Sequence, residues 1–294
     1  MRAYVPSYDA VAPATLDDAL ALLAAEPGVW TPLAGGTDLM VRFEAGQLPP
    51  GRFLSLWHLA ELRGVTVSAG AIRIGALTTY GELRDHPAVA AELPLLAHAA
   101  RETGAIAIQN RGTIGGNIAT ASPAADSPPG LIAYGAEVTL VSASGPRVVP
   151  YRDFHTGYKA TVRRPDELIA AVTVRRHAPA DGWRHVFHKV GTRRYQAISK
   201  ICFAGTALVR DGQVRDVGVG LGAVGPTVRA AHATERLLRG ADLAAPDLEA
   251  RVAQALAEDV APIDDLRSTA RFRVQVAKNL GAAFVRALRE PPEA

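Results

Sequence analysis

After residue 182 the chain contains three strand-like segments in direct succession, and only then three helical stretches. The strand-like segments lie between residues 183 and 224 and are rich in valine, which favours extended structure. The helical stretches lie between residues 228 and 289 and have apolar residues three and four apart. Consecutive strands pair as antiparallel neighbours, whereas a doubly wound parallel sheet needs a helix between its strands. The order therefore predicts an α+β chain whose C-terminal part is an antiparallel sheet with helices.

The preceding part of the chain mixes shorter strands with helices. Thr15 precedes a helical run with acidic residues in its first turn, the pattern of a capped helix start. The segment 178–182, with proline and glycine, is the clearest linker. These features predict three domains, at residues 1–56, 57–177 and 178–294. The other elements expected are a helix at 16–23, strands at 29–34 and 52–56, a hairpin at 62–76, one helix at 88–101, and strands at 136–143 and 167–174.

Two glycine-containing segments are candidates for binding an anion. The first is LAGGTDL, residues 33–39, which follows an expected strand. Gly35 and Gly36 allow a close approach of the backbone, and Thr37 and Asp38 can cap the helix that follows. Such a turn gathers several backbone N–H groups that can bind a phosphate. Taken alone, the segment is equally typical of an ordinary corner between a strand and a helix.

The second segment, RGTIGGNIATASPAAD, has the same physics with more donors. Thr113, Gly115, Gly116 and Asn117 can offer main-chain and side-chain hydrogen bonds to phosphate oxygens. Because such donors can hold a diphosphate, the segment needs no lysine. The small residues that follow leave room for a flat ring, and the segment ends on the carboxylate of Asp126. The structural alternative is a plain loop with Asp126 as a surface acid.

Other motifs carry less weight. GLGAVG, residues 220–225, matches G-x-G-x-x-G, but Pro226 follows directly and no strand–helix–strand unit surrounds it. A glycine-rich turn is the better interpretation. His185 and His188 fall on opposite faces of an expected strand, which argues against a metal site. The sequence contains no nucleophile elbow, zinc-protease motif or Walker lysine.

Composition narrows the function further. The net charge is +3, and the basic residues are scattered instead of clustered, which argues against nucleic-acid binding. No stretch approaches the ~18 apolar residues of a membrane span. The single cysteine, Cys202, excludes an internal disulfide and an iron–sulfur cluster held by this chain alone. The first residues lack the pattern of a secretory signal, so a cytoplasmic location is expected.

The order of LAGGTDL, TIGGNIATASPAAD, FHTGYK and HKVGTRRYQAISK resembles the FAD-binding medium subunit of the molybdenum hydroxylases, the xanthine dehydrogenase and carbon monoxide dehydrogenase family. The resemblance covers nearly the whole chain. It implies FAD as the cofactor. It also implies a two-subdomain FAD-binding fold of the vanillyl-alcohol-oxidase type, followed by an α+β C-terminal domain.

The resemblance implies roles for individual residues. The two glycine segments would line the FAD diphosphate, Asp126 would lie near the flavin ring, and Ile169 would contact the flavin. Lys189 aligns with a basic residue that approaches the isoalloxazine, and Tyr195 with an aromatic residue that lies against the ring in the carbon monoxide dehydrogenase branch. No catalytic nucleophile is expected. The implied FAD-binding residues are Leu33, Ala34, Gly35, Gly36, Thr37, Asp38, Leu39, Thr113, Ile114, Gly115, Gly116, Asn117, Ala121, Asp126, Ile169, Lys189 and Tyr195.

The implied role is electron transfer within a complex, a dimer of heterotrimers. Electrons would leave a molybdenum cofactor in a large subunit, cross [2Fe–2S] clusters in a small subunit, and pass through FAD to NAD, oxygen or a quinone-linked carrier. Two alternatives stay open: a stand-alone FAD-dependent oxidase or dehydrogenase, and a redox-inactive nucleotide-binding assembly protein. The first lacks an evident covalent flavin anchor or substrate base. The intact glycine segments argue against the second.

Overall fold

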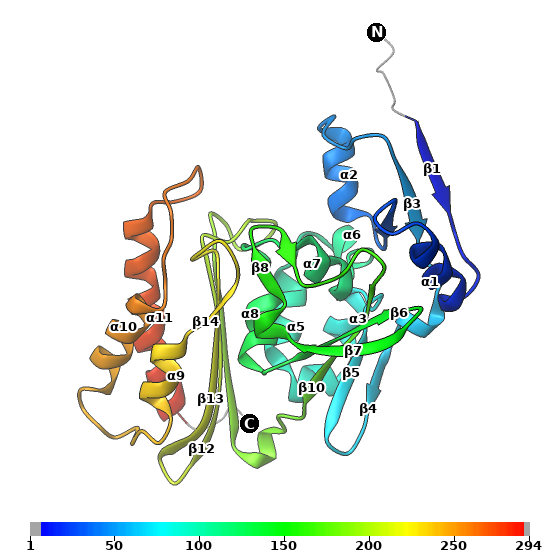
Figure 1. Cartoon of the computed structure of the whole chain (residues 1–294). Helices are drawn as coiled ribbons and strands as arrows, with labels where there is room; N and C mark the ends of the chain where they lie inside the picture. Colours follow the sequence, from blue (N-terminus) through cyan, green and yellow to red (C-terminus); the bar gives the residue numbers. More distant parts are fainter. Residues whose placement is uncertain (1–6, 291–294) are drawn as a thin grey trace.

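The computed structural model of the protein describes residues 7–290 and has three main sheets, one after another along the chain (Figure 1). The first sheet is parallel, with β3 (Gly51–Ser55) between β1 (Tyr8–Val11) and β2 (Trp30–Leu33). Helix α1 (Leu16–Ala25) connects β1 to β2, and α2 (Thr37–Glu44) connects β2 to β3. Helix α2 therefore serves as the crossover between the parallel neighbours β2 and β3, whereas α1 connects the two edge strands.

Helix α1 begins as the sequence predicts. The Thr15 side chain accepts a hydrogen bond from the Asp18 N–H, and the Asp18 carboxylate accepts one from the Thr15 N–H. This reciprocal arrangement satisfies two N–H groups that a helix start leaves open. Leu20 and Leu23 of α1 are buried in the same apolar cluster as Leu168 of the second sheet. The first sheet is thus packed against the second.

The second sheet is antiparallel, with the order β4–β5–β10–β6–β7 and the eight-residue β10 (Leu168–Arg175) at its centre. Buried residues of β5, β6 and β10 form one core with residues of α5, α7 and α8. The remaining strands are β4 (Val65–Val67), β5 (Ala71–Gly75), β6 (Glu137–Ser142) and β7 (Gly145–Pro150), with the short pair β8 (His155–Gly157) and β9 (Ala160–Thr161). The helices are α3 (Tyr80–Asp85), α4 (Pro87–Glu92), α5 (Pro94–Glu102), α6 (Ile106–Gln109), α7 (Ile114–Thr120) and α8 (Pro128–Ala133), and the 3₁₀ turns are η1 (Ala60–Leu62), η2 (Tyr151–Asp153) and η3 (Pro179–Asp181).

The single helix expected at 88–101 is wrong, because two helices occupy that stretch. Helix α4 ends at Glu92 and α5 begins at Pro94. A proline inside a helix lacks the N–H that the helix needs and clashes with the preceding turn, whereas proline is favoured at the first helical position. Leu93 leaves the helical conformation between them, with φ −127° and ψ 50°.

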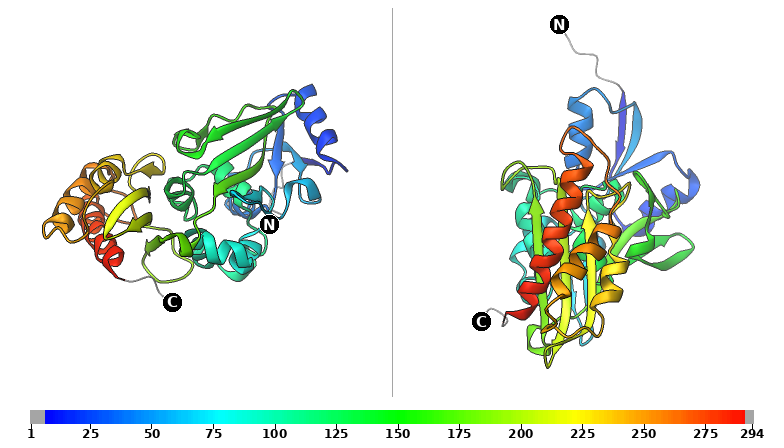
Figure 2. Two further views of the ribbon diagram at one scale, coloured as in Figure 1. Left: turned by 90° about the horizontal axis from the view of Figure 1, so that it is seen from below. Right: turned by 90° about the vertical axis from the view of Figure 1, so that its left-hand side faces the viewer.

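The C-terminal sheet is antiparallel in the order β11–β12–β13–β14, with helices on its outer face, as the two views of Figure 2 show. Phe203 of β12 and Phe284 of α11 meet edge to face in its core, with ring centroids 5.4 Å apart. The strands are β11 (Trp183–Val190), β12 (Ile201–Arg210), β13 (Gln213–Gly222) and β14 (Arg229–Ala230), and the helices are α9 (His232–Leu238), α10 (Leu248–Glu258) and α11 (Ala270–Arg289). The helix expected from residue 228 begins only at His232, because Arg229 and Ala230 pair with β13 instead.

The inner face of this sheet lies directly on α8 of the second part. A Cβ at Gly218 would lie 2.0 Å from the Ala133 carbonyl oxygen, and one at Gly220 would lie 2.0 Å from the Pro129 carbonyl oxygen. Only glycine permits main chain to approach main chain so closely. The GLGAVG segment therefore owes its first glycine to packing, and its strand continues through Gly222.

The predicted α+β class with an antiparallel C-terminal sheet and helices is confirmed. The three sheets lie within residues 8–55, 65–175 and 183–230. The domain boundaries at 56 and 177 stay a prediction.

Two histidines near the contact of the second and third sheets, the buried His177 and the half-buried His185 of β11, make stability depend on pH. Burial lowers the pKa of His177 and of His185 from the ordinary 6.5 to about 4. Between these values the unfolded chain binds protons that the folded chain does not, so stability falls as pH falls from 6.5 toward 4. Each unit of pKa shift is worth about 1.4 kcal/mol.

We therefore expect urea unfolding midpoints of the purified chain to be markedly lower at pH 5 than at pH 7.5. The His177 Nδ1 contacts the Arg175 carbonyl oxygen at 2.7 Å, and His177→Asn keeps a donor near that oxygen. This variant should reduce the difference between the two urea midpoints. His58→Asn, on the exposed surface, is the matched control and should leave it unchanged. Equal wild-type midpoints at the two pH values would contradict this explanation.

Candidate functional site

A groove lies between the first sheet and the helices of the second part, and the two glycine segments form part of its lining. Its cavity volume is about 740 Å³, within the range of small-molecule sites. The segments meet at Gly35, where a Cβ would lie only 1.7 Å from the Arg111 carbonyl oxygen. Two stretches about eighty residues apart in the sequence are thus brought together, as their shared chemistry predicts.

The first glycine segment leads into α2, and no side chain caps the N-terminus of that helix. Gly36 is the N-cap of α2 in a left-handed conformation, φ 77°, and supplies no side-chain hydrogen bond. The N–H groups of a helix's first turn have no acceptor within the helix. Thr37, Asp38 and Leu39 form that turn and line the groove, so their N–H groups are available to an anionic ligand.

The expectation that Thr37 and Asp38 cap this helix is wrong. Both residues already belong to the helix, because the left-handed turn at Gly36 starts it one residue earlier. A capping residue must precede the helix, so neither side chain takes that role.

The second glycine segment contains a short helix, α7, over Ile114–Thr120, and residues 121–126 continue as turns. Thr113 is its N-cap and accepts a hydrogen bond from the Gly116 N–H at 3.1 Å. The Ile114 N–H donates to the Thr78 carbonyl, and the Gly115 N–H to the Ala76 carbonyl. These main-chain donors are therefore used inside the protein, unlike those of α2. The residues of this segment that line the groove are Gly112, Thr113, Gly115, Gly116, Asn117, Ala119, Thr120, Ser122 and Ala125.

Gly115 is required mainly by packing. A Cβ there would lie 2.6 Å from the Cβ of Ala76. Gly116 faces a more open space, where a Cβ would meet the Thr113 hydroxyl oxygen at 3.0 Å and the Ala34 Cβ at 3.9 Å. The two adjacent glycines thus serve different purposes, one against the core and one toward the groove.

Three basic side chains also line the groove, and sequence reasoning missed them. They are Arg42 on α2, Lys159 beside the β8–β9 pair, and Arg163 shortly after it. The Arg163 guanidinium donates to the Arg164 and Glu167 carbonyls, and burial lowers its pKa. Lys159 closes the FHTGYK segment, the one signal in the sequence that pointed to this region. Arg111, the one basic residue of the second glycine segment, lies over the Trp57 ring, so the cations that line the groove come from other parts of the chain.

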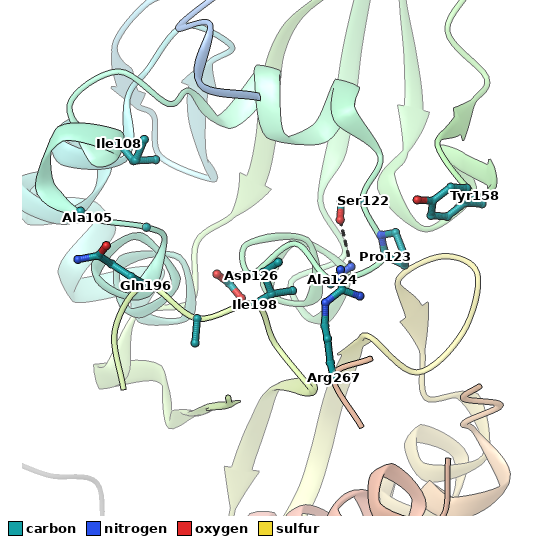
Figure 3. Close-up of a pocket in the computed structure, with 12 residues that line it drawn as sticks. Ala105, Ile108, Ser122, Pro123, Ala124, Asp126, Tyr158, Gln196, Ile198 and Arg267 are labelled. Carbon is teal, nitrogen blue, oxygen red and sulfur yellow. Dashed lines mark hydrogen bonds between the residues drawn. The ribbon is translucent and has the colours of Figure 1, made fainter. Parts of the chain in front are cut away.

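A second cavity of about 420 Å³ continues from the groove, and Figure 3 shows its lining. The two share Ile108, Ser122 and Ile198. Asp126 contributes from the end of the second glycine segment, and Arg267 from the C-terminal part. We refer to these two spaces as the groove and the side cavity.

Asp126 is 9% exposed, which excludes the alternative of a surface acid. Its Oδ2 accepts a hydrogen bond from the Lys189 ammonium at 2.7 Å, and its Oδ1 accepts one from the Ser199 hydroxyl at 2.7 Å. Burial raises the pKa of Asp126, while Lys189 and Ser199 act in the opposite direction. The Lys189 side chain is 2% exposed, so it is part of a buried ion pair.

The other predicted residues fall in different places. Ala34 and Ile169 line the groove with the first glycine segment. Ile114 and Ala121 are buried in the protein core and do not line the groove. Ala121 is the C-cap of α7 and has a left-handed conformation. Leu33 is the last residue of β2. Tyr195 is 53% exposed and lies on the loop that follows β11, away from the lining of both cavities.

Comparison with known proteins agrees with this geometry. Residues 6–175 match the family described as "FAD binding domain in molybdopterin dehydrogenase", and residues 186–288 match the "CO dehydrogenase flavoprotein C-terminal domain". A putative xanthine dehydrogenase FAD-binding subunit of Escherichia coli K12 is 32% identical over 272 residues, 91% of each chain. The chain belongs to the FAD-binding subunits of the molybdenum hydroxylase family. It is a flavoprotein and an oxidoreductase subunit.

Other relatives of this FAD-binding subunit cover it almost completely. The glyceraldehyde dehydrogenase medium chain of Sulfolobus acidocaldarius is 32% identical over 94% of this chain and 96% of its own. The solved carbon monoxide dehydrogenase of Hydrogenophaga pseudoflava has a chain with a TM-score of 0.91, 29% identity and coverage of 97% and 98%. A chain of quinoline 2-oxidoreductase from Pseudomonas putida gives a TM-score of 0.85 at 26% identity, covering 98% of this chain and 99% of its own.

The residues present fit FAD. The groove combines an uncapped helix start, a glycine cradle and three cations, which together suit a diphosphate. Its apolar members, Leu62, Leu77, Leu168 and Ile169 among them, suit flat ring systems.

Within residues 7–290 no helix is long and apolar enough to cross a membrane. The same residues hold no cluster of three or more histidine, cysteine or acidic side chains arranged for a metal ion.

Proposed function

We propose that this flavoprotein is the electron-transfer subunit of a multi-subunit molybdenum hydroxylase. In this proposal it works in the cytoplasm beside a small [2Fe–2S] subunit and a large molybdenum-cofactor subunit, as a dimer of heterotrimers. The observation that carries the proposal is the near-complete match, across both of its parts, to medium chains of such enzymes. With one cysteine, this sequence has no ligand set of its own for an iron–sulfur cluster, which is consistent with the proposal that a partner subunit carries the clusters.

The chain's own residues hold the cofactor and shape its surroundings. Bound FAD supplies the redox chemistry, and the protein supplies position and electrostatics. The N–H groups of Thr37, Asp38 and Leu39 would bind the diphosphate, and Lys159 and Arg163 would offset its charge. The proposed FAD-binding set keeps the residues expected from the sequence, with Arg42, Lys159 and Arg163 added.

Asp126 and Lys189 would act near the flavin end as a pair. Lys189 is buried and paired with Asp126. It would therefore act on the cofactor indirectly, by fixing the position of the Asp126 carboxylate and offsetting its charge. The side cavity, which continues from the groove past Asp126, is the proposed approach for the electron acceptor. Tyr195 would take part through its loop, whose residues 196–198 line that cavity.

Purification of the native complex through a tag on this chain tests the proposal. We expect two further chains, one small and one large, in equal amounts, and a mass of twice the heterotrimer. The visible spectrum should combine flavin and iron–sulfur absorption, with one FAD released per copy of this chain on heating. A yellow chain that purifies alone and oxidises a substrate by itself would overturn the proposal in favour of a stand-alone oxidase. A colourless chain would favour the assembly protein.

A further inference from the structure

A buried chain of hydrogen bonds ends on the side chain of Asn117 in α7. The Tyr80 hydroxyl lies 3.0 Å from the Ser127 hydroxyl oxygen, and the Ser127 hydroxyl donates to Asn117 Oδ1 at 3.0 Å. Tyr80 is the first residue of α3, and Ser127 directly precedes α8. Tyr80 is 2% exposed and Ser127 1% exposed, whereas Asn117 is half-buried on the wall of the groove. Two buried hydroxyls are thus linked to a side chain that faces the ligand space.

The hydroxyl hydrogens fix the direction of this chain. Each hydroxyl has one hydrogen to donate. Within residues 7–290 the Tyr80 hydroxyl has no hydrogen-bond partner besides Ser127, so its buried hydrogen is satisfied only when it donates to Ser127. Burial raises the pKa of Tyr80, so the hydroxyl keeps this hydrogen. Ser127 then donates its own hydrogen to Asn117, and the Asn117 atom that receives it must be the side-chain oxygen.

Ser127 is available for this role because of the residues that follow it. It is the N-cap of α8, a position where a serine usually accepts a hydrogen bond from the first turn of its helix. Pro128 and Pro129 begin that helix and have no N–H to donate. The Ser127 side chain accordingly makes no capping hydrogen bond, and its hydroxyl bonds with Tyr80 and Asn117 instead.

The nitrogen of the Asn117 side chain faces the groove. Within the described part of the chain Nδ2 has no hydrogen-bond partner, yet it is not among the buried unpaired atoms, so it is accessible from the groove that Asn117 lines. An amide nitrogen donates two hydrogens and accepts none. In this orientation Asn117 therefore presents only donors to the groove, and these suit a phosphate oxygen.

We infer that Tyr80 and Ser127 are positioning residues that hold the Asn117 amide with its nitrogen toward the groove, and so favour an anionic ligand there. The inference rests on the proposed function, which places the FAD diphosphate in this groove. A reversed amide would present its oxygen to the phosphate oxygens, and the two would repel. Tyr80 and Ser127 exert this effect through Asn117, without a hydrogen bond of their own to the diphosphate.

The dissociation constant of FAD tests the inference. It is measured by titrating the flavin-depleted complex with FAD and following flavin fluorescence. Ser127→Ala should raise Kd about fivefold, because Asn117 Oδ1 then lacks a donor whenever the nitrogen faces the cofactor. Tyr80→Phe keeps the ring and the Ser127 hydroxyl but no longer fixes the direction of donation. With both amide orientations populated, Kd should rise about twofold. This variant carries the test if Ser127→Ala does not fold.

Asn117→Ala supplies a comparison that a merely structural role would not pass. If Ser127 acts through Asn117, then Ser127→Ala should have no further effect on Kd in the Asn117→Ala background. Tyr151→Phe is the matched control. It also removes a tyrosine hydroxyl from the same core, but within residues 7–290 that hydroxyl is buried without a hydrogen-bond partner. Its Kd should equal that of the wild type.

An unchanged Kd in Ser127→Ala would overturn the inference, and so would an equal rise with and without Asn117. A rise in Tyr151→Phe as large as in Tyr80→Phe would also overturn it, because loss of any buried hydroxyl would then suffice. In each of these cases the wild-type complex still binds FAD, and the proposed function stands. A wild-type complex that binds no FAD would overturn the proposed function, and the inference with it.

Discussion

Gly35→Ala is expected to purify with little or no FAD. The added Cβ would lie 1.7 Å from the Arg111 carbonyl oxygen and 3.2 Å from the Gly112 nitrogen, where no flexible side chain can yield. The two glycine segments must therefore move apart, and the start of α2 moves with Gly35. Overpacking of this kind costs about 1–3 kcal/mol in stability, and the displaced N–H groups reduce affinity further. The FAD-to-protein ratio of the purified complex measures the effect.

Gly70→Ala is the matched control for this prediction. Gly70 lies at the tip of the β4–β5 hairpin, where an added Cβ would have no atom within 4 Å and the backbone has no left-handed φ. It should keep full FAD content. Gly116→Ala should give an intermediate loss, because its Cβ would contact the Thr113 hydroxyl at 3.0 Å. Full FAD occupancy in Gly35→Ala would show that the contact between the two segments relaxes without disturbing the groove.

Lys189→Met is expected to lower the free energy of unfolding at pH 7 by about 3–5 kcal/mol, because it leaves the Asp126 carboxylate buried without its cation. Removing Lys189 also removes the main group that opposes the rise in the pKa of Asp126. The folded variant then binds a proton that the unfolded chain does not. Its deficit should therefore shrink as pH falls from 7 toward that raised pKa. Urea unfolding of the full chain at several pH values measures both effects.

The double variant Lys189→Met/Asp126→Leu supplies the decisive comparison. With no charge left in the site, it should recover much of the stability that the single variant loses. It should also lack the pH dependence of the deficit. A double variant as unstable as the sum of its single variants would mean that the pair does not interact energetically.

The α+β class could be predicted from the order of the strands and helices, and the meeting of the two glycine segments from their shared suitability for one diphosphate. Thr15 and Asp18, three residues apart, form a pattern that predicts a helix start. Each pair of adjacent glycines predicts a close approach of the backbone to another group. The break at Pro94 was also available from the sequence, since proline cannot continue a helix interior. The apolar spacing on both sides of Pro94 favours a single helix, but the proline interrupts it.

The rest depends on contacts between distant residues. Lys189 and Asp126 are 63 residues apart, and no local pattern states that a cation on one sheet meets a carboxylate beyond α7. Lys159 and Arg163 reach the groove because the β8–β9 pair carries them there. The main-chain donors of α7 appeared free in the sequence, yet the carbonyls of Ala76 and Thr78 take them. Tertiary packing decides each of these.

The glycine contacts between β13 and α8 limit the motion of the C-terminal sheet relative to the FAD-binding part. Backbone lies on backbone at Gly218 and Gly220, leaving no side chain whose rotation could let the two halves swing. The C-terminal sheet is therefore expected to stay fixed against α8. Lys189, which belongs to that sheet, is thereby held where its ammonium meets Asp126 of the FAD-binding part.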